Sequence, residues 1–359
     1  MSKFLSGRFA SLGVYVPGEQ PVDTEYVKLN TNESPYPPAP GVVAAVNEAE
    51  LKKLCLYPNP DGARLIGRLA EFYGVNPENV IIGNGSDELL AFAFLAFCDG
   101  RRGVCFPDIT YGFYPVYAEL YGIPAEQIPL TDDFTVDVSA YLGVGKNIIL
   151  ANPNAPTGIA IPLSDIEMIA RSNPDHITLV DEAYVDFGAQ SAIPLALKYE
   201  NLLIVHTYSK ARSMAGARLA YAIGSAPLIE DLNKMKYSFN PYNVNRLTQI
   251  AGEAALSEDA YYRETHRKIK ATRGYTESKL RELGFTMTES SANFLFAKHP
   301  DISGHKMYAA LKEKGILVRH FNKPRISDYL RITIGTKEQM DAMLAAMAEI
   351  FETIEGRMV

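Results

Sequence analysis

Tryptophan is absent from this chain of 359 residues, and cysteine is scarce. The three cysteines, Cys55, Cys98 and Cys105, are odd in number and lack the spacing of a metal site. Secreted proteins held by disulfides carry paired cysteines, so we expect free thiols in a reducing compartment, with the cytoplasm as the location. The six histidines show no His-Glu-x-x-His pattern or comparable ligand spacing, which argues against a metal site and a metal hydrolase.

Long hydrophobic runs are missing as well. The most apolar stretch, Leu89 to Cys98, is roughly half of a membrane span, and we expect a buried core helix there. The first residues, MSKFLSGRFASLGVYVPG, contain no apolar run of signal-peptide length before a cleavage site. We therefore expect neither export nor contact with a membrane.

Positive charge is not in excess. The net charge is −7, the isoelectric point is about 5.5, and there is no long basic run. Proteins that bind nucleic acids carry a basic patch, so no nucleic-acid partner is expected. The hydrophobic fraction of 47% is ordinary for a folded globular protein. Since a single core rarely grows beyond about 250 to 300 residues, the length favours one large and one small domain.

Short β-rich runs alternate with helical stretches from about residue 80 to residue 225. These runs are VIIG at 80, GVCF at 103, NIILANP at 147, HITLVDEAY at 176 and NLLIVHTYS at 201. Such alternation indicates βαβ units and an α/β fold with a mainly parallel sheet. Several runs are apolar without alternation, as strands buried on both faces should be, so helices are expected to cover the sheet.

The two ends of the chain follow other patterns. The first residues contain Gly and Pro with little periodicity, which predicts an arm over residues 1–30 that packs on the small domain or on a partner. A large domain is expected over residues 31–245. The remaining residues, 246–359, contain a polar helical tract from Gln249 to Leu283 and strand-like runs ANFLFAK at 292 and YLRITIG at 329, which predicts a small α+β domain.

Ligands of open α/β sheets bind where the carboxyl ends of strands lead into helices. Lys210 follows such a strand, in TYSKARSMAGAR, between hydroxyl residues and the cations Arg212 and Arg218. A partly desolvated lysine near other cations has a depressed pKa, as an amine that attacks an aldehyde requires. A loop lysine taken alone is more often solvated, so this residue needs support from its neighbours.

Asp181 ends another apolar strand, in LVDEAYVDF. A carboxylate at this position points into the ligand crevice and can keep a ring nitrogen protonated. Tyr184, three residues on, could donate to a phenolate oxygen. A helix N-cap or a solvated acid is the competing interpretation of the motif alone.

The segment IIGNGSDELL has a glycine-rich turn from a strand into a helix. Free N–H groups at a helix N-terminus bind anions, and glycines let the backbone approach a ligand, so this turn suits a phosphate. Capping explains the same residues equally well, with Ser86 as the N-cap and Asp87 and Glu88 complementing the helix dipole.

A fourth segment, NPNAPTG at residues 152 to 158, is a proline-rich loop directly after a strand. GNGSDE, NPNAPTG, DEAY and SK, with Arg218 eight residues after the lysine, have the order and separations of fold-type I pyridoxal phosphate enzymes. The sequence resembles the aminotransferase class that includes histidinol-phosphate aminotransferase. YVPGEQP at 15, LNTNESPYPP at 29, YPNPDG at 57 and LRITIGT at 330 extend this resemblance over nearly the whole chain.

The resemblance implies roles around the cofactor ring. Lys210 would form the Schiff base with pyridoxal 5'-phosphate and then move a proton, while Asp181 would pair with the pyridinium nitrogen. Tyr111, in PDITYGFY, resembles the aromatic residue that stacks on the ring. The family usually has Asn directly before Pro-Thr-Gly to bind the phenolic oxygen, but this chain has Ala155 there and Asn154 one residue earlier. Either Asn154 takes over, or Tyr184 alone holds that oxygen.

The resemblance also implies how the cofactor phosphate is held. Helix N-terminal amides of Gly85, Ser86 and Asp87, the hydroxyls of Thr207 and Ser209, and the guanidinium fork of Arg218 would bind it. Tyr57 resembles the residue that reaches the phosphate of the neighbouring subunit, so a homodimer with a shared active site is expected.

For the substrates, Arg331 in LRITIGT resembles the arginine that clamps the carboxylate of glutamate, and Arg319 in ILVRHF resembles a second anion ligand. Tyr15 and Asn32, in the N-terminal region, would close over the substrate. The partners implied are small molecules, an amino donor and a 2-oxo acid acceptor.

The implied reaction is a ping-pong transamination from histidinol phosphate to 2-oxoglutarate in histidine biosynthesis. An aromatic amino-acid aminotransferase or a phosphothreonine decarboxylase has a similar scaffold and stays an alternative. A non-catalytic nucleotide-binding α/β protein is the alternative from another class. Against it, the sequence has neither Gly-x-x-x-x-Gly-Lys-Ser/Thr nor a complete Gly-x-Gly-x-x-Gly after a strand, and it also lacks the Gly-x-Ser-x-Gly of hydrolases.

Overall fold

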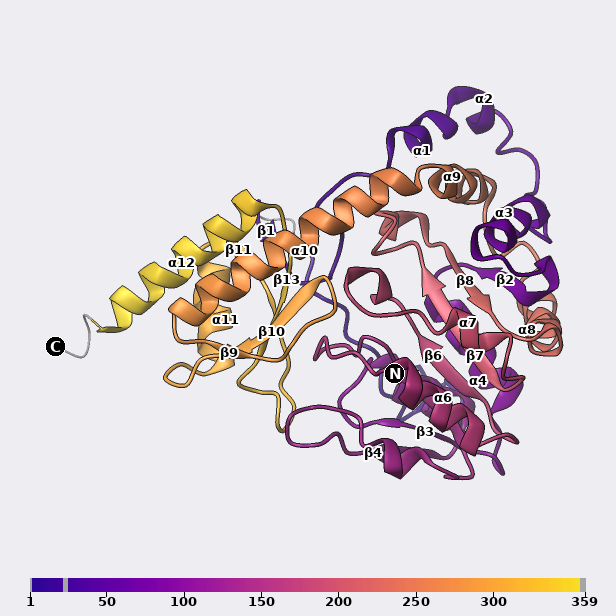
Figure 1. Ribbon diagram of the computed structural model, residues 1–359, viewed down its shortest axis with the longest axis horizontal. Helices are drawn as coiled ribbons and strands as arrows, with labels where there is room; N and C mark the ends of the chain where they lie inside the picture. Colours follow the sequence, from indigo (N-terminus) through magenta and orange to yellow (C-terminus); the bar gives the residue numbers. More distant parts are fainter. Residues whose placement is uncertain (1, 22–24, 356–359) are drawn as a thin grey trace.

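A computed structural model describes residues 2–21 and 25–355, and its largest element is a seven-stranded sheet. The strand order is β2-β8-β7-β6-β5-β3-β4 (Figure 1). The strands are β2 (Val80–Gly83), β3 (Val104–Pro107), β4 (Ala125–Ile128), β5 (Asn147–Ala151), β6 (Thr178–Asp181), β7 (Leu202–Thr207) and β8 (Ala220–Ile223). β8 is antiparallel to both neighbours, and all other pairs are parallel. The predicted α/β class with a mainly parallel sheet is confirmed.

The five predicted strands of this region are all present, and two more were not predicted. β4 has the sequence AEQI with only Ile128 buried, so it lacks the apolar run that marks the others. β8 is a short strand with the sequence AYAI, which comes after the loop that contains Lys210 and pairs with β7 in the antiparallel direction. β2, β3, β5, β6, β7 and β8 are buried along their whole length, as strands covered on both faces should be.

Helices cover both faces of the sheet. One face is packed by α4 (Ser86–Phe97), α5 (Phe113–Tyr121) and α8 (Ala226–Phe239). The other is packed by α3 (Ala63–Tyr73), α6 (Leu163–Ser172), α7 (Ile193–Ala196) and α9 (Arg246–Ser257). Six of the twelve residues of α4 are buried, all of them between Leu89 and Phe97, which confirms the core helix expected from Leu89 to Cys98.

Local sequence explains where these helices end. In α3, Leu65, Leu69 and Ala70 lie on one face and are buried, while the opposite face is polar. The helix ends at Gly74, whose φ of 67° is the left-handed conformation that glycine adopts without strain. At the start of α9, the side chain of Asn245 accepts a hydrogen bond from the backbone N–H of Thr248 at 3.0 Å.

A smaller body is built from the C-terminal third of the chain. Its four-stranded sheet has the order β12-β13-β10-β9, with antiparallel pairing throughout. The strands are β9 (Thr286–Met287), β10 (Phe294–Lys298), β12 (Arg319–His320) and β13 (Leu330–Thr333), and the helices are α11 (Gly304–Glu313) and α12 (Lys337–Glu355). The predicted strand-like runs at 292 and 329 correspond to β10 and β13. This body is the expected smaller α+β part of the molecule.

The long polar tract predicted from Gln249 to Leu283 is two helices, α9 and α10 (Asp259–Glu282), separated at Glu258. Buried residues of α9 belong to the core of the large sheet. Along α10, Tyr262 packs in that same core, whereas Ile269 packs in the core of the smaller body. Figure 1 shows α10 running from one body to the other. We propose a domain boundary within α10, which fits this packing better than the predicted boundary at residue 246.

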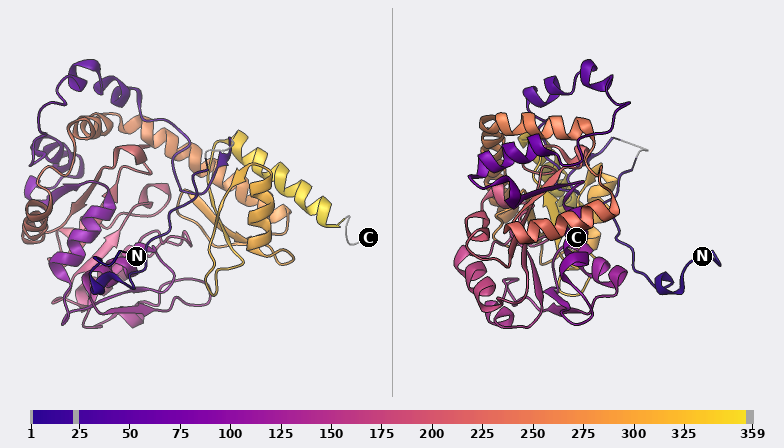
Figure 2. Two further views of the ribbon diagram at one scale, coloured as in Figure 1. Left: turned by 180° about the vertical axis from the view of Figure 1, so that it is seen from behind. Right: turned by 90° about the vertical axis from the view of Figure 1, so that its right-hand side faces the viewer.

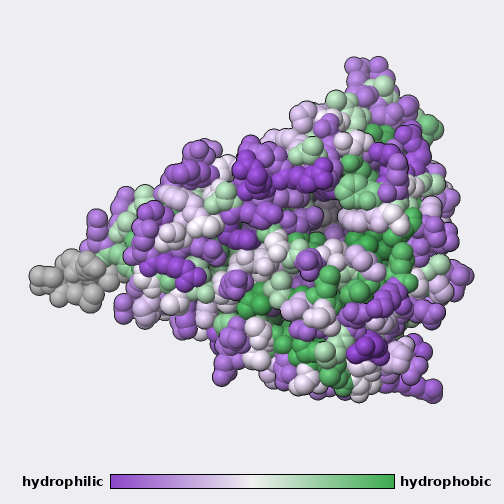
Figure 3. Space-filling model, viewed as in Figure 1, coloured by the Kyte–Doolittle hydropathy of each residue, from purple (hydrophilic) through white to green (hydrophobic). Residues whose placement is uncertain are grey.

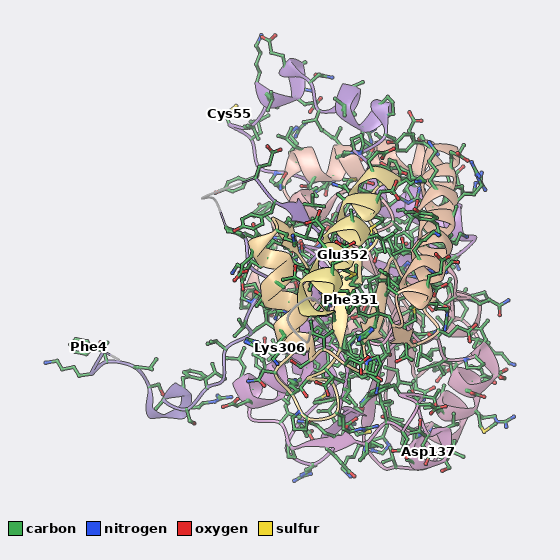
Figure 4. The ribbon with its side chains drawn as sticks, turned by 90° about the vertical axis from the view of Figure 1, so that its left-hand side faces the viewer. Phe4, Cys55, Asp137, Lys306, Phe351 and Glu352 are labelled. Atoms are coloured by element: carbon green, nitrogen blue, oxygen red, sulfur yellow. The ribbon has the colours of Figure 1, made fainter. Side chains whose placement is uncertain are left out.

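The N-terminal region contacts the smaller body. β1 (Val27–Lys28) pairs in parallel with β11 (Ile316–Leu317). Residues 1 and 22–24 of the predicted arm lie outside the described residues. Figures 2 and 4 show the first residues, with Phe4 near their end, projecting away from the rest of the molecule.

The remaining short helices are α1 (Pro40–Ala45), α2 (Glu48–Leu51), η1 (Gly7–Phe9), η2 (Pro77–Asn79), η3 (Val138–Tyr141), η4 (Val185–Phe187) and η5 (Ala215–Ala217). Figure 4 shows Cys55 near the tip of the extension that contains α1 and α2. Within the described ranges, no helix combines the length and the apolar character that a membrane crossing requires. Figure 3 shows hydrophilic residues along α10 and more hydrophobic ones over the larger body.

A buried ion pair joins the end of β6 to the neighbouring strand β7. Glu182, directly after β6, lies 2.7 Å from Nε2 of His206 in β7. The same carboxylate accepts hydrogen bonds from the Ser191 hydroxyl and the Ala192 N–H, both at 2.6 Å. Burial opposes a charge on His206, but the hydrogen bond and charge of Glu182 outweigh it and raise the pKa of His206.

Glu182→Ala is expected to lower the free energy of unfolding by about 3 to 5 kcal/mol, because it leaves His206 and two other donors buried without a partner. Urea denaturation followed by circular dichroism measures this. Glu167→Ala is the matched control, because Glu167 pairs with Lys198 in a partly exposed position and its loss should change stability little. Equal destabilisation by the two substitutions would contradict the importance of the buried pair.

Candidate active site

A cavity of about 440 Å³ lies at the carboxyl ends of the central parallel strands. Ala151, Asp181 and Thr207, the last residues of β5, β6 and β7, all line it. The smaller body contributes Arg319, Phe321, Lys323, Ile326 and Arg331. This volume is typical of a small-molecule site, and its position is the one that open α/β sheets use for ligands.

Most of the residues singled out in the sequence meet at this cavity. Its lining includes Tyr15, Asn32, Ser86, Asp87, Tyr111, Asp181, Tyr184, Thr207, Ser209, Lys210, Arg218, Arg319 and Arg331. Gly85, Asn154 and Tyr57 are not part of the lining. Gly85 adjoins it beside Ser86, whereas the other two lie in different surroundings, described below.

Lys210 is half-buried in the loop that follows β7. Its Nζ donates a hydrogen bond to the carbonyl oxygen of Thr31 at 3.1 Å. Burial, reinforced by repulsion from Arg331 and Arg218, lowers the pKa of Lys210 to about 8. The amine therefore has a far larger neutral fraction near neutral pH than an exposed lysine has.

Asp181 is buried at the end of the neighbouring strand. Its carboxylate accepts hydrogen bonds from the Tyr114 hydroxyl at 3.1 Å and from the Ala183 N–H at 3.2 Å. Burial nevertheless raises the pKa of Asp181 to about 6. A cationic N–H brought beside this carboxylate would favour its charged form, so the position suits a protonated ring nitrogen.

The N-terminus of α4 and Arg218 form an anion-binding corner. Gly85 has a φ of 80°, and a Cβ on it would lie only 2.4 Å from Nη2 of Arg218, so a side chain at this position would displace the guanidinium. Arg218 Nη2 pairs with Asp87 at 2.9 Å, and its Nη1 donates to the Ser209 hydroxyl at 3.4 Å. The unpaired N–H groups and the dipole of a helix N-terminus also attract anions.

Two tyrosines donate hydrogen bonds to carboxylates of the site: Tyr111, which lines the cavity, to Asp87, and Tyr114 to Asp181. The Tyr111 hydroxyl donates to Asp87 Oδ1 at 2.8 Å, and its ring meets that of Tyr114 edge to face at 5.6 Å. Burial raises the pKa of Tyr111, so this hydroxyl stays protonated and remains a donor. Tyr114 was not predicted from the sequence. Its position three residues after Tyr111, near the start of a helix, is the signal that could have indicated that the two side chains lie close together.

Arg331 is a half-buried cation at the side of the cavity formed by β13, and its Nε atom is buried. Its Nη2 donates to the carbonyl of Asn30 at 3.0 Å, and its Nε has no hydrogen-bond partner among the described residues. Phe294 and Phe321 pack against the guanidinium, with centroid distances of 5.5 and 5.6 Å. A buried donor without a partner is costly, so this guanidinium is suited to an anionic ligand.

Arg319 binds the protein's own N-terminal arm. Its guanidinium donates to the carbonyls of Val16 at 2.9 Å and Pro17 at 3.1 Å. These bonds hold Tyr15 in the cavity, where its ring stacks on Phe113 at a centroid distance of 4.2 Å. Lys323, in the loop after β12, also lines the cavity, and the sequence carries no distinct signal for it.

The side chain of Asn154 does not reach the cavity. Its Nδ2 donates to the Ile109 carbonyl at 2.9 Å and to the Thr157 hydroxyl at 3.0 Å, and its Oδ1 accepts from Thr110 at 2.8 Å. Ala155 lines the cavity in its place. Of the two alternatives for the phenolic oxygen, this arrangement favours Tyr184 as the protein donor.

Tyr57 also lies outside the cavity. It is 78% exposed, and its ring stacks on Tyr242 at a centroid distance of 4.6 Å. Its hydroxyl is therefore available to another molecule rather than to the cavity of its own chain.

The family model for aminotransferase class I and II matches residues 24–347. Histidinol-phosphate aminotransferase of Marinomonas sp. (strain MWYL1) is 50% identical, over 97% of this chain and 99% of that protein. The enzyme of the same name from Brachyspira hyodysenteriae is 48% identical, over 98% of this chain and all of that protein.

Solved structures show the same fold. The histidinol-phosphate aminotransferase of Sinorhizobium meliloti, solved in complex with pyridoxal 5'-phosphate, superposes with a TM-score of 0.89 at 23% identity and covers 99% of both chains. Aspartate aminotransferase of Thermus thermophilus with maleate superposes with a TM-score of 0.80, over 91% of this chain and 92% of that one. With the matching family model and relatives of this similarity over the full length, the chain belongs to the class I and II aminotransferases, among the histidinol-phosphate aminotransferases.

Proposed function

We propose that this protein is a pyridoxal phosphate-dependent aminotransferase that converts histidinol phosphate and 2-oxoglutarate into imidazole acetol phosphate and glutamate, a step of histidine biosynthesis. The observation that carries the proposal is the half-buried Lys210 amine with a lowered pKa, which lines the same cavity as the Asp181 carboxylate and the anion-binding corner. The names of the full-length relatives support the choice of substrate.

The residues present fit the cofactor. Gly85 leaves room for Arg218 beside the α4 N-terminus, a cradle that a Cβ would fill and that suits a phosphate. Asp181 suits the pyridine nitrogen, and Lys210 suits the aldehyde. When bound, pyridoxal phosphate supplies an electron-withdrawing ring that stabilises negative charge on the substrate carbon bearing the amine.

The protein's own groups move and hold protons. Lys210 Nζ is neutral in part of the molecules at neutral pH. It can therefore accept a proton from the substrate carbon that bears the amine and deliver it to the cofactor carbon. The Asp181 carboxylate keeps the ring nitrogen protonated and is itself aligned by Tyr114. Tyr111 would supply a flat surface for the cofactor ring, and Tyr184 would donate a hydrogen bond to the phenolic oxygen.

The far end of the cavity binds the anionic ends of both substrates. Arg331 has an unused Nε in a buried position, which suits the carboxylate of glutamate or 2-oxoglutarate. Lys323 provides a second positive charge at the lining. A phosphate monoester and a dicarboxylate are both anions, so one cationic end serves the two half-reactions in turn.

The purified enzyme loaded with cofactor is expected to form glutamate from histidinol phosphate and 2-oxoglutarate. Lys210→Ala should lower kcat by about 10² to 10⁴-fold or more, because a positioned acid–base group is lost. The control is Lys198→Ala, an exposed lysine paired with Glu167, which should retain full activity. A coupled glutamate assay measures all three proteins.

Two other results would contradict the substrate assignment. Rapid deamination of phenylalanine or tyrosine without turnover of histidinol phosphate would indicate an aromatic aminotransferase. Release of carbon dioxide from phosphothreonine would indicate the decarboxylase. Either outcome leaves the lysine chemistry in place and changes only the substrate.

The lowered pKa of Lys210 predicts a distinct pH dependence in the cofactor-free protein. Acetic anhydride labels only neutral amines, so labelling of Lys210 should rise with pH and be half-maximal near pH 8. Arg331→Gln should move that midpoint to higher pH, because a repelling cation is removed. Lys198 is the internal reference: hydrogen bonding to Glu167 raises its pKa, so it should react only at higher pH. Peptide mass spectrometry gives both profiles, and coincident profiles would refute the prediction.

We propose further that the enzyme is a homodimer whose subunits share their active sites. Large exposed apolar side chains gather on the extension that contains α1 and α2, namely Val43, Leu51, Leu54, Leu56 and Tyr57. Clustered apolar residues of this kind are typical of a protein interface, and a second copy of the chain is the partner that family membership suggests. Tyr57 of one subunit would then reach the phosphate corner of the other.

Subunit mixing tests the shared site. Tyr57→Phe keeps the ring on Tyr242 but removes the hydroxyl, so it should weaken cofactor affinity by about tenfold or more, the value of a hydrogen bond to a charged group. Refolding this variant together with Lys210→Ala should restore sites with wild-type affinity, because each mixed dimer has one intact pair. Fluorescence titration measures the affinity. A fully active monomer in sedimentation equilibrium would exclude the shared site.

The cytoplasm is the location we propose. Cys55, Cys98 and Cys105 are all free thiols in the structure. Burial raises the pKa of Cys98 and Cys105 to about 12, so neither is a reactive thiolate. Unpaired thiols are ordinary in a reducing compartment.

A further inference from the structure

Asn32 lies where the N-terminal region, the smaller body and the cavity meet. It is 1% exposed, lines the cavity and has a left-handed backbone with a φ of 57°, which asparagine tolerates better than most residues. Its side-chain Nδ2 donates to the hydroxyl oxygen of Tyr184 at 3.0 Å. This contact joins residues that are 152 positions apart in the sequence.

Two residues of the smaller body hold Asn32 in this conformation. The backbone N–H of Asn32 donates to Oγ1 of Thr333 at 3.0 Å, and the Thr333 hydroxyl donates to Oδ1 of Asn32 at 3.0 Å. Nδ2 of Asn293 donates to the Asn32 carbonyl at 3.0 Å. Asn32 is therefore fixed at its N–H, its carbonyl and its side-chain oxygen.

These bonds decide which end of the Asn32 amide faces Tyr184. The Thr333 hydroxyl accepts the N–H of Asn32 and gives its single hydrogen to Oδ1, so Nδ2 is the end left for Tyr184. An amide nitrogen only donates, which makes the Tyr184 oxygen an acceptor in this pair. The Tyr184 hydrogen has no acceptor among the described residues, so it is free to point into the cavity that Tyr184 lines.

We propose that Asn32 is a positioning residue that makes Tyr184 a hydrogen-bond donor toward a ligand oxygen in the cavity. The proposal rests on the proposed function, in which that oxygen is the phenolic oxygen of pyridoxal phosphate. Ala155 presents only a methyl group to the cavity, and the Asn154 side chain is fully used elsewhere. The direction of the Tyr184 hydroxyl therefore matters more in this chain than it would with a second donor beside it.

Asn32→Asp tests the direction of the hydrogen bond with little change in shape. A carboxylate can only accept, so Asp at this position would draw the Tyr184 hydrogen out of the cavity. The ligand oxygen would then lose its donor, carry more negative charge and hold the proton near Lys210 more tightly. The pH midpoint of the visible absorption of the cofactor-loaded enzyme is expected to rise by about one unit, in the same direction as for Tyr184→Phe.

A double-substitution cycle separates this effect from that of an added negative charge. In the Tyr184→Phe background there is no hydroxyl to turn, so Asn32→Asp should cause little further shift of the midpoint. Asn240→Asp, the same substitution at an exposed position after α8 and outside the cavity lining, is the control and should leave the midpoint unchanged. Thermal unfolding of each loaded variant verifies that it is folded.

Each outcome supports or overturns the proposal. A raised midpoint in Asn32→Asp that disappears in the Tyr184→Phe background supports it. An unchanged midpoint overturns it, and so does a shift that persists without the Tyr184 hydroxyl. If the wild-type protein shows no visible absorption with pyridoxal phosphate, the proposed function fails instead, which is a separate and recognisable result.

Discussion

The partial burial of the Lys210 amine beside two other cations is the constraint on which the site depends. An ammonium group resists burial, and the nearby guanidinium groups of Arg331 and Arg218 resist it further, so the neutral amine is favoured. This half-buried position depends on the loop that leads from β7 into the adjacent strand β8, and on the N-terminal region, which closes the other side through Thr31. The reactivity of this lysine is thus a property of the packed structure around it.

The same burial sets the electrostatic character of the whole cavity. Asp181 has a raised pKa, and Arg331 has a lowered pKa with one donor unsatisfied. Each of these groups is in an environment that disfavours its charge and would be stabilised by an oppositely charged ligand atom. A cationic ring nitrogen would stabilise the charge of Asp181, and an anionic group of a substrate would stabilise the charge of Arg331. Ligand binding and charge stabilisation would therefore occur together.

Both bodies of the molecule and the N-terminal region must be in place for the site to be complete. The large body supplies Lys210 and Asp181, β13 supplies Arg331 and Thr333, and the N-terminal region supplies Tyr15 and Asn32. Arg319, in the smaller body, links that body to the N-terminal region by donating hydrogen bonds to the backbone of the arm. Contacts among these three regions therefore connect the position of the smaller body to the direction of the Tyr184 hydroxyl.

The sequence by itself determined the α/β class, most strands of the large sheet and most of the site residues, because these depend on local patterns. A buried strand is an apolar run, and residues that follow such strands meet at one edge of a parallel sheet. The polar strand β4 lacks that signal and was not predicted. Only the tertiary structure decided that Asn154 faces its own loop, that Arg319 binds the arm, and that Tyr114 and Lys323 join the site. The physical reason is that the direction of a side chain depends on partners distant in the sequence, and motif spacing carries no information about them.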